Sequence, residues 1–323
     1  MGLTSTSTGA GAADTALVLR RERPDDRIVA LAGNPNVGKS TVFNALTGLR
    51  QHTGNWPGKT VTSAQGRCER GGRGYVLVDL PGTYSLMAHS AEEEVARDFL
   101  CFGGADGAVV VCDATCLERN LNLVLQTLEL QPRTVVCVNL LDEAERKGVR
   151  VELEALSRRL GVPVVGAAAG RGEGLEALMA AVEGVISAPE PPTPVPVRYP
   201  PPVEFAVASL RPLLEPRLRG RLPARWTALR LLEGDGAFLD RLSAALEWDP
   251  RADAALWGAV EEARADLERQ GLGGGAWCER VVSALVETAE AIGAASVTQL
   301  RSAAGRREQR LDRLLTSRAT GIP

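Results

Sequence analysis

GNPNVGKS occupies residues 33–40 and matches the pattern GxxxxGK[ST]. The apolar run IVALA (28–32) precedes it, and TVFNALTG (41–48) follows with a helix-like pattern that stops at Gly48. A glycine-rich turn between a buried strand and a helix allows backbone N–H groups to surround phosphate oxygens, and the helix adds its positive N-terminal end. This placement predicts a phosphate-binding loop.

The residue types in this loop predict distinct contacts. We expect Lys39 to reach the β- and γ-phosphates of a nucleotide, and the hydroxyl of Ser40 to ligate Mg²⁺. The residues predicted to bind the nucleotide here are Gly33, Asn34, Pro35, Asn36, Val37, Gly38, Lys39, Ser40 and Thr41.

Further apolar runs follow, separated by stretches long enough for helices. They are YVLVDL (75–80), AVVVCDA (108–114), TVVCVNL (134–140) and VPVVGA (162–167), and unbroken apolarity is typical of strands covered on both faces. Their alternation with helices predicts an α/β fold with a mostly parallel sheet. We expect this domain over 27–188, with helices over 91–102, 118–130, 150–160 and 174–187.

The remainder of the chain has a different character. Residues 1–26 are expected to form a disordered tail, and the proline-rich residues 189–202 an extended linker. Beyond the linker, segments rich in Ala, Leu, Arg and Glu predict a smaller all-α domain over 203–318. The helices expected there are 203–218, 225–233, 237–247, 252–270, 275–293 and 296–317.

Motifs at the ends of three apolar runs add the remaining nucleotide chemistry. In Asp79-Leu80-Pro81-Gly82, the carboxylate is suited to a Mg²⁺-bound water and the Gly82 amide to the γ-phosphate. In Asn139-Leu140-Leu141-Asp142, the Asp142 carboxylate can accept hydrogen bonds from guanine N1 and N2, which adenine cannot supply. Ala168-Ala169 lies where a Ser-Ala pair usually backs the base, and the missing serine predicts a looser grip. The motifs together predict a Mg²⁺-dependent GTPase that converts GTP to GDP and phosphate.

One catalytic group is missing from the pattern. Thr83 follows Gly82 at the position where many GTPases carry a water-orienting glutamine. We therefore expect the attacking water to be held by other groups and turnover to be slow, far below the roughly 5–20 s⁻¹ of hydrolysis assisted by an arginine finger.

Composition excludes several other classes of function. The 323 residues carry a formal net charge of −3, whereas a nucleic-acid-binding domain normally has a basic excess. No apolar run approaches the roughly 18–20 residues that cross a bilayer. The cysteines lie mostly in apolar runs, which is typical of a reducing, cytosolic compartment, and no second pair or nearby histidine completes a metal site with Cys112 and Cys116.

The motifs taken in order resemble a known family. From about residue 27 to the final residue, the sequence is similar to the cytosolic N-terminal region of the ferrous-iron transport protein B (FeoB) family, a G domain followed by a helical domain. The pieces that carry the resemblance are GNPNVGKSTVFNALTG (33–48), GNWPGKT (54–60), DLPGTYSL (79–86), ERNL (118–121), NLLDEAERKG (139–148), RW (225–226) and LLEGD (231–235).

The resemblance implies roles that the residue patterns alone do not give. Thr60 would complete Mg²⁺ coordination when GTP is bound, and Asn36 would help to hold K⁺ against the phosphates, together with backbone carbonyls of 54–58. A cation there would neutralise transition-state charge in place of an arginine finger. The implied catalytic residues are Lys39, Asn36, Gly82 and Thr60. The implied nucleotide-side loop consists of Gly54, Asn55, Trp56, Pro57, Gly58, Lys59 and Thr60.

The resemblance also implies a biological setting. The chain would be the regulatory GTPase of a ferrous-iron transporter on the cytoplasmic side of the bacterial inner membrane. Its partners would be the membrane permease portion, covalent or separate, small accessory Feo proteins and further copies of itself, and residues 319–323 would begin the membrane region. The alternative is a stand-alone GTPase of ribosome assembly or RNA handling. That class calls for a basic RNA-binding appendage, which the helical second half does not offer.

Overall fold

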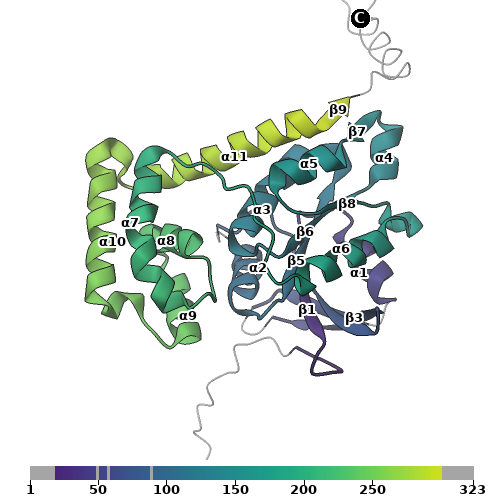
Figure 1. Cartoon of the computed structure of the whole chain (residues 1–323), viewed down its shortest axis with the longest axis horizontal. Coiled ribbons are helices and arrows are strands. Elements are labelled where there is room, and N and C mark those ends of the chain that lie inside the picture. Colours follow the sequence, from purple (N-terminus) through teal and green to yellow (C-terminus); the bar gives the residue numbers. More distant parts are fainter. Residues whose placement is uncertain (1–18, 49–50, 57–58, 88–89, 300–323) are drawn as a thin grey trace, which may run out of the picture.

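The computed structural model describes residues 19–48, 51–56, 59–87 and 90–299. Its centre is a seven-stranded sheet with the strand order β2-β3-β4-β1-β5-β6-β8 (Figure 1). From β4 to β8 neighbouring strands run parallel, so their carboxyl ends meet at one edge. These strands confirm the predicted mostly parallel sheet and are β4 Arg73–Asp79, β1 Arg27–Gly33, β5 Gly107–Asp113, β6 Thr134–Asn139 and β8 Val164–Gly166.

Helices cover both faces of this sheet. Because side chains alternate along a strand, Val29 and Leu31 of β1 join one buried cluster while Ile28 and Ala30 join the other. The first cluster includes α1 (Lys39–Thr47) and α6 (Leu175–Ser187), and the second includes α2 (Ala91–Phe102), α3 (Leu117–Leu130) and α5 (Leu153–Leu160). Short elements complete this part of the chain: η1 Ala114–Cys116, α4 Leu141–Arg146, β7 Val149–Val151 and η2 Ala169–Arg171.

Two strands at one edge of the sheet escape the sequence analysis. β2 (Gln51–Asn55) pairs antiparallel with β3 (Thr62–Arg70), and β3 pairs antiparallel with β4. β3 returns to β4 through a tight turn at Gly71 and Gly72, both with positive φ. Neither QHTGN nor TSAQGRCER shows the apolar run that identified the central strands, and the side chains that β3 buries include the polar Ser63 and Gln65.

The second part of the chain is built from helices. Residues 188–200 contain no helix or strand, and α7 begins at Pro201. Figure 1 shows α7, α8 and α10 packed into a separate lobe, from which α11 returns across the sheet domain. Its helices are α7 Pro201–Leu218, α8 Ala224–Glu233, α9 Gly236–Leu246, α10 Ala254–Leu267 and α11 Ala276–Ser296.

The end of α11 corrects one expectation. A helix was expected over 296–317, but Val297–Gln299 forms strand β9, which pairs antiparallel with β7 of the sheet domain. The β-branched Val297 and Thr298 suit a strand, and β7 supplies the hydrogen-bonding partner. β7 also shortens the helix expected over 150–160, which begins at Leu153. Residues 300–323, including the expected start of a membrane region, lie outside the described residues, as do residues 1–18 of the expected tail.

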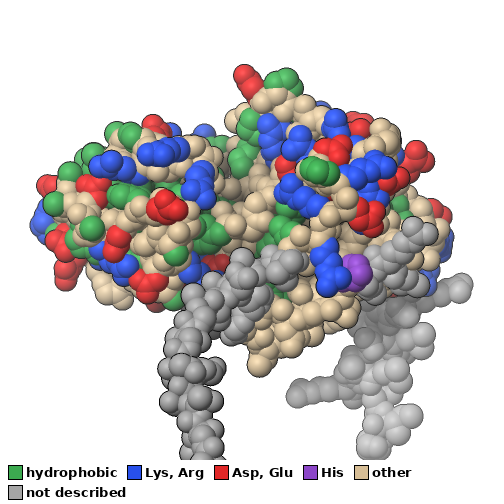
Figure 2. All heavy atoms as spheres, turned by 90° about the horizontal axis from the view of Figure 1, so that it is seen from below, with side chains coloured by type: hydrophobic (Ala, Val, Ile, Leu, Met, Phe, Trp, Pro, Cys, Tyr) green, Lys and Arg blue, Asp and Glu red, His purple; other side chains and the backbone are tan. Residues whose placement is uncertain are grey.

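The described surface mixes both signs of charge. On the face in Figure 2, Lys and Arg side chains are interspersed with Asp and Glu over both lobes. Among the helices of the described residues, none combines the length and apolarity needed to cross a membrane.

Candidate nucleotide-binding site

The predicted phosphate-binding loop lies between the end of β1 and the start of α1. Asn36 and Gly38 both have left-handed backbone conformations, with φ of 66° and 77°. A Cβ atom at Gly38 would lie 2.4 Å from Nδ2 of Asn139, so this position has neither the conformation nor the space for a larger residue. The loop is therefore fixed against the β6 end of the sheet.

Lys39 contacts the end of β4. Its buried ammonium group donates hydrogen bonds to the carboxylate of Asp79 and, at 2.6 Å, to the carbonyl oxygen of Leu80. The structure thus brings together two residues that the sequence assigned to the same nucleotide. To reach phosphate oxygens, the Lys39 side chain has to leave Asp79.

The oxygen atoms expected to bind Mg²⁺ are a hydroxyl and a carboxylate. Ser40 and Thr41 are exposed in the first turn of α1, next to Lys39. Asp79 ends β4 beside the same turn, as its contact with Lys39 shows. Hard oxygen donors of this kind suit Mg²⁺, which prefers few protein ligands together with phosphate oxygens. The donor set fits the metal.

The segment after Asp79 packs closely on the phosphate-binding loop. A Cβ atom at Gly82 would lie 3.3 Å from Cα of Pro35, and the amide of Thr83 donates to the carbonyl oxygen of Gly33 at 3.2 Å. The buried Thr83 hydroxyl donates to the carbonyl oxygen of Ser85 at 2.8 Å. Thr83 is therefore engaged within its own turn.

Gln126 is a residue of this region that sequence reasoning missed. From α3, its Oε1 accepts hydrogen bonds from the Leu86 amide at 2.7 Å and from the Ser85 hydroxyl at 3.1 Å. Gln126 fixes the middle of the 79–87 segment. Its place on a helix far along the chain leaves no local signal in the sequence.

Asn139 joins the two sides of the expected base pocket. Its buried side chain donates from Nδ2 to the carbonyl oxygen of Val37 at 3.1 Å and accepts at Oδ1 from the amide of Ala169 at 3.0 Å. One side chain thereby holds the phosphate-binding loop and the 168–174 loop at a fixed separation.

The amides of the predicted base-backing pair are already engaged. The Ala168 amide donates to the carbonyl oxygen of Glu173 at 3.1 Å, and the Ala169 amide donates to Asn139. Both side chains are buried, whereas Gly170 is exposed. The Ala168 and Ala169 amides are thus used within the protein, and Gly170 is the next residue of the loop whose backbone is exposed.

Asp142 already has a basic partner. Its Oδ2 lies 3.2 Å from Nε of Arg171, which projects from η2. Sequence reasoning passed over Arg171, although it stands between Gly170 and Gly172, directly after Ala169. The charged residue between two glycines, next to a predicted base-binding pair, was the sequence signal that could have identified Arg171 as a site residue.

Trp56 and Lys59, two described residues of the 54–60 loop, contact α2. The ring of Trp56 is buried edge-on against Phe99, with centroids 5.5 Å apart, and the Lys59 ammonium group pairs with the carboxylate of Glu94. The Trp56 amide donates to the carbonyl oxygen of Val61 at 2.7 Å. Neither the Trp56 nor the Lys59 side chain is available to a nucleotide in this conformation.

Of the remaining residues of that loop, the structure describes Gly54, Asn55 and Thr60. Gly54 and Asn55 belong to β2, and Pro57 and Gly58 lie outside the described residues. Thr60 is exposed, and within the described part of the chain no hydrogen bond joins it to Ser40 or Asp79.

α2 connects the nucleotide side to the helical lobe through buried charges. The Arg97 side chain is 1% exposed, with Nε 3.1 Å from Asp98 Oδ1 and Nη1 2.8 Å from Asp235 Oδ2. Arg241 of α9 pairs with the other oxygen of Asp98. Burial raises the pKa of Asp98 in spite of these cations. These ion pairs join α2, which follows the 79–87 segment in the sequence, directly to α9.

A second contact joins the same segment to α8. Arg230 is buried and donates from Nη2 to Sδ of Met87 at 3.5 Å. Its Nη1 lies 2.6 Å from the carboxylate of Glu233. Phe102 and Phe238 stack across the same boundary, with centroids 6.1 Å apart. The helical lobe thus packs on the 79–102 region.

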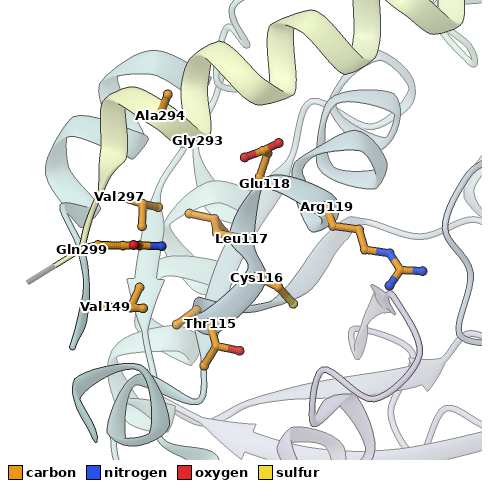
Figure 3. Close-up of a pocket in the computed structure, with 11 residues that line it drawn as sticks. Thr115, Cys116, Leu117, Glu118, Arg119, Val149, Gly293, Ala294, Val297 and Gln299 are labelled. Atoms are coloured by element: carbon orange, nitrogen blue, oxygen red, sulfur yellow. The ribbon is translucent and has the colours of Figure 1, made fainter. Parts of the chain in front are cut away.

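A hollow of about 510 Å³ lies between the start of α3 and the junction of α11 with β9 (Figure 3). In Figure 3 Glu118 points beneath α11, whereas Arg119 points away from it. The Arg119 guanidinium lies 4.4 Å from the ring centroid of the exposed Tyr84, and its carbonyl oxygen accepts from Asn34 Nδ2 at 3.4 Å. Cys116 lines the hollow at the surface, while Cys112 is buried in the core.

Comparisons with known families agree with this architecture. A family model described as "Ferrous iron transport protein B" matches residues 27–182. A second, described as "FeoB cytosolic helical domain", matches residues 199–298.

Individual relatives show the same likeness. The Fe(2+) transporter FeoB of Shigella flexneri is 41% identical over 211 residues, which make up 64% of this chain and 27% of that protein, so the match spans about a quarter of its length. The cytosolic domain of the T. maritima FeoB iron transporter in apo form is 30% identical with a TM-score of 0.69, covering 84% of this chain and 99% of that one. Its GMPPNP form is 31% identical with a TM-score of 0.67, over 84% and 99% of the two chains.

Proposed function

The chain belongs to the ferrous iron transport protein B family, as a G domain followed by the family's cytosolic helical domain. We propose that it binds and hydrolyses GTP as the regulatory part of a ferrous-iron membrane transporter. A relative solved in a GMPPNP form supports the choice of nucleotide.

The observation that carries the proposal is the position of Asn139. By bonding Val37 on one side and Ala169 on the other, it sets a fixed distance between a phosphate-binding loop and a base-binding loop. Asp142, three residues further on, offers the acceptor that guanine N1–H and N2–H require. The exposed Gly170 amide is the donor we assign to the purine 6-oxygen.

For hydrolysis we propose three groups of this chain: the Lys39 ammonium, the Gly82 amide and the backbone of the 54–60 loop. Lys39 binds the β- and γ-phosphates after leaving Asp79, and the Gly82 amide meets the γ-phosphate. Since the Thr83 hydroxyl is bonded to Ser85, it does not orient water, and the backbone of the 54–60 loop takes that role. The expected consequence is slow turnover.

Ser40, Asp79 through a water, and Thr60 are the Mg²⁺ ligands we propose. Asn36 is exposed, so its amide oxygen is accessible to K⁺, with carbonyl groups of the 54–58 loop as companions. When bound, these cations neutralise charge on the phosphates. Thr60 and Lys59 belong to a segment that contacts α2 here, so the proposed metal site requires that segment to move toward Ser40.

The helical lobe is the route by which we propose that nucleotide state reaches the membrane portion. Its contacts with the 79–102 region, through Arg97 and Arg230, supply the physical connection. The proposed partners are the permease portion of the transporter, small accessory Feo proteins and further copies of this chain. The proposed place of action is the cytoplasmic side of the bacterial inner membrane.

GTP hydrolysis by the purified chain in KCl and in NaCl at equal ionic strength tests the proposal. We expect Mg²⁺-dependent hydrolysis that KCl stimulates, and we expect Asn36→Ala to abolish the stimulation while hydrolysis in NaCl persists. Lys39→Ala serves as the inactive control. Equal rates in both salts would remove Asn36 and K⁺ from the mechanism and leave the GTPase, whereas absence of hydrolysis in either salt would refute the GTPase itself.

A further inference from the structure

The carboxylate proposed to recognise guanine is not free in this conformation. Asp142 Oδ2 and Arg171 Nε lie 3.2 Å apart, with 22% of the Asp142 side chain and 57% of the Arg171 side chain exposed. Guanine needs both oxygens of this carboxylate, one for N1–H and one for N2–H. The Arg171 guanidinium therefore pairs with one of the two Asp142 oxygen atoms to which guanine would donate.

The loop that carries Arg171 is held in place by its own hydrogen bonds. Ala168 and Glu173 form a β-bridge that closes the loop, with amide-to-carbonyl distances of 3.1 and 3.3 Å. Inside it, the Arg171 amide donates to the Ala168 carbonyl oxygen at 2.8 Å. Asn139 anchors the same loop through Ala169. These hydrogen bonds hold the backbone of Arg171 at a fixed position relative to the β6–α4 turn, which leads to Asp142.

Other charges near Asp142 do not reach its carboxylate. Arg146 donates from Nε to the backbone carbonyl oxygen of Asp142 at 3.3 Å and pairs weakly with Glu143 at 3.9 Å. Lys147 lies 3.8 Å from Glu143. Within the described residues, Arg171 is the basic side chain paired with the guanine-recognition carboxylate.

We infer that Arg171 is an internal competitor of guanine for Asp142 and thereby lowers guanine-nucleotide affinity and shortens nucleotide residence. The inference rests on the proposed function. Each binding event exchanges the Arg171–Asp142 pair for hydrogen bonds to the base, and each release is assisted by the return of Arg171. An internal group of this kind suits a switch that has to exchange GDP for GTP.

The exposure of the pair limits the size of the effect. A half-exposed ion pair contributes little to an equilibrium, so removal of Arg171 should tighten GDP binding by about two- to fivefold. The change should appear mainly as slower dissociation, because the returning guanidinium of Arg171 competes with the base for Asp142 while the nucleotide leaves.

Binding and release of a fluorescent GDP analogue by the whole chain test this inference. The variants are Arg171→Ala and Arg171→Gln, with Arg146→Ala as a control that removes the same charge from α4 without touching the carboxylate. A double-mutant cycle with Asp142→Asn reports whether Arg171 acts through that carboxylate. Circular dichroism checks that each variant is folded.

Tighter binding and slower release in both Arg171 variants, unchanged values in Arg146→Ala, and no effect of Arg171→Ala in the Asp142→Asn background would support the inference. Unchanged or weaker binding in the Arg171 variants would overturn it, as would tightening that persists without the Asp142 charge. Wild-type protein that fails to bind the GDP analogue would instead refute the proposed function, and the inference with it.

Discussion

Replacement of Arg97 by methionine should weaken the attachment of the helical lobe to α2. The guanidinium is 1% exposed and lies between Asp98 and Asp235, at 3.1 and 2.8 Å. Breaking a buried ion pair costs about 3–5 kcal/mol when the remaining charge is left alone. Here Asp98 keeps Arg241 and Asp235 is partly exposed, so we expect a loss of about 2–3 kcal/mol in the free energy of unfolding.

Urea unfolding followed by tryptophan fluorescence measures this loss. Trp226 is a suitable reporter because its ring lies 5.4 Å from that of Phe238, which the Arg97 guanidinium also contacts at 5.2 Å. Methionine retains most of the buried volume, so the change isolates the charge. The matched control is Arg211→Met, since Arg211 pairs with Glu215 on the exposed surface of α7 and should cost less than about 0.5 kcal/mol.

Acidification supplies a second test with a definite sign. Burial raises the pKa of Asp98 above its ordinary value, so the folded state favours the protonated form and gains stability from this group as pH falls through the raised pKa. Because the positive charge of Arg97 lowers the pKa of Asp98, its removal strengthens the preference of the folded state for protonated Asp98. The difference between Arg97→Met and wild type should therefore shrink as pH falls from 7 toward the pKa of Asp98. A loss equal to that of the Arg211 control, or a difference that widens on acidification, would refute the assignment of Arg97 as a buried charge link.

Three further perturbations address the site and the core. Gly38→Ala should abolish GDP binding and lower the melting temperature, because its Cβ would meet Asn139 Nδ2 at 2.4 Å in a left-handed conformation; retained GDP affinity in a fluorescence titration would contradict this. Gln126→Ala should lower the GTPase rate several-fold with GDP affinity unchanged, since it holds only the segment after Asp79; equal loss of both would point to general unfolding. Iodoacetamide should modify the exposed Cys116 faster as pH rises from 8, because partial burial raises its thiol pKa and leaves the thiolate scarce at pH 8, and it should spare Cys137, whose pKa burial raises to about 12; peptide mass spectrometry that finds Cys137 modified in folded protein would contradict its burial.

The central strands could be predicted because each is buried on both faces and is therefore an unbroken apolar run in the sequence. IVALA and TVVCVNL are apolar without interruption, and each became a strand covered on both faces. β9 could not be predicted in this way. Val297, Thr298 and Gln299 are a strand because β7 lies beside them, and β7 lies beside them because α11 packs against α3. That relation is a property of tertiary packing, which a window of neighbouring residues does not contain.

The site was predictable to the extent that its residues follow a motif. Lys39 and Asp79, and Asn139 with the 168–174 loop, lie together as the order of motifs indicates. Gln126 and Arg171 act through contacts between segments that are distant in sequence or unmarked by a pattern. The hydrogen bond from the Ala169 amide to Asn139, which is the reason for proposing Gly170 as the base-side donor, likewise joins segments that are distant in sequence.

At both ends of the candidate site, a basic side chain of the protein pairs with the carboxylate that we assign to a ligand. Lys39 is paired with Asp79, and Arg171 with Asp142, so each carboxylate assigned to a ligand is neutralised before the ligand arrives. Under the proposed function, attraction of Lys39 to the phosphates would free Asp79 for Mg²⁺, and binding of the phosphates and of the metal would then be mutually favourable. At the base end, the proposed competition would require guanine to displace Arg171 from Asp142. Taken together, these proposals give joint binding of phosphate and metal with a weak hold on the base, which is the combination that repeated exchange of GDP for GTP would require.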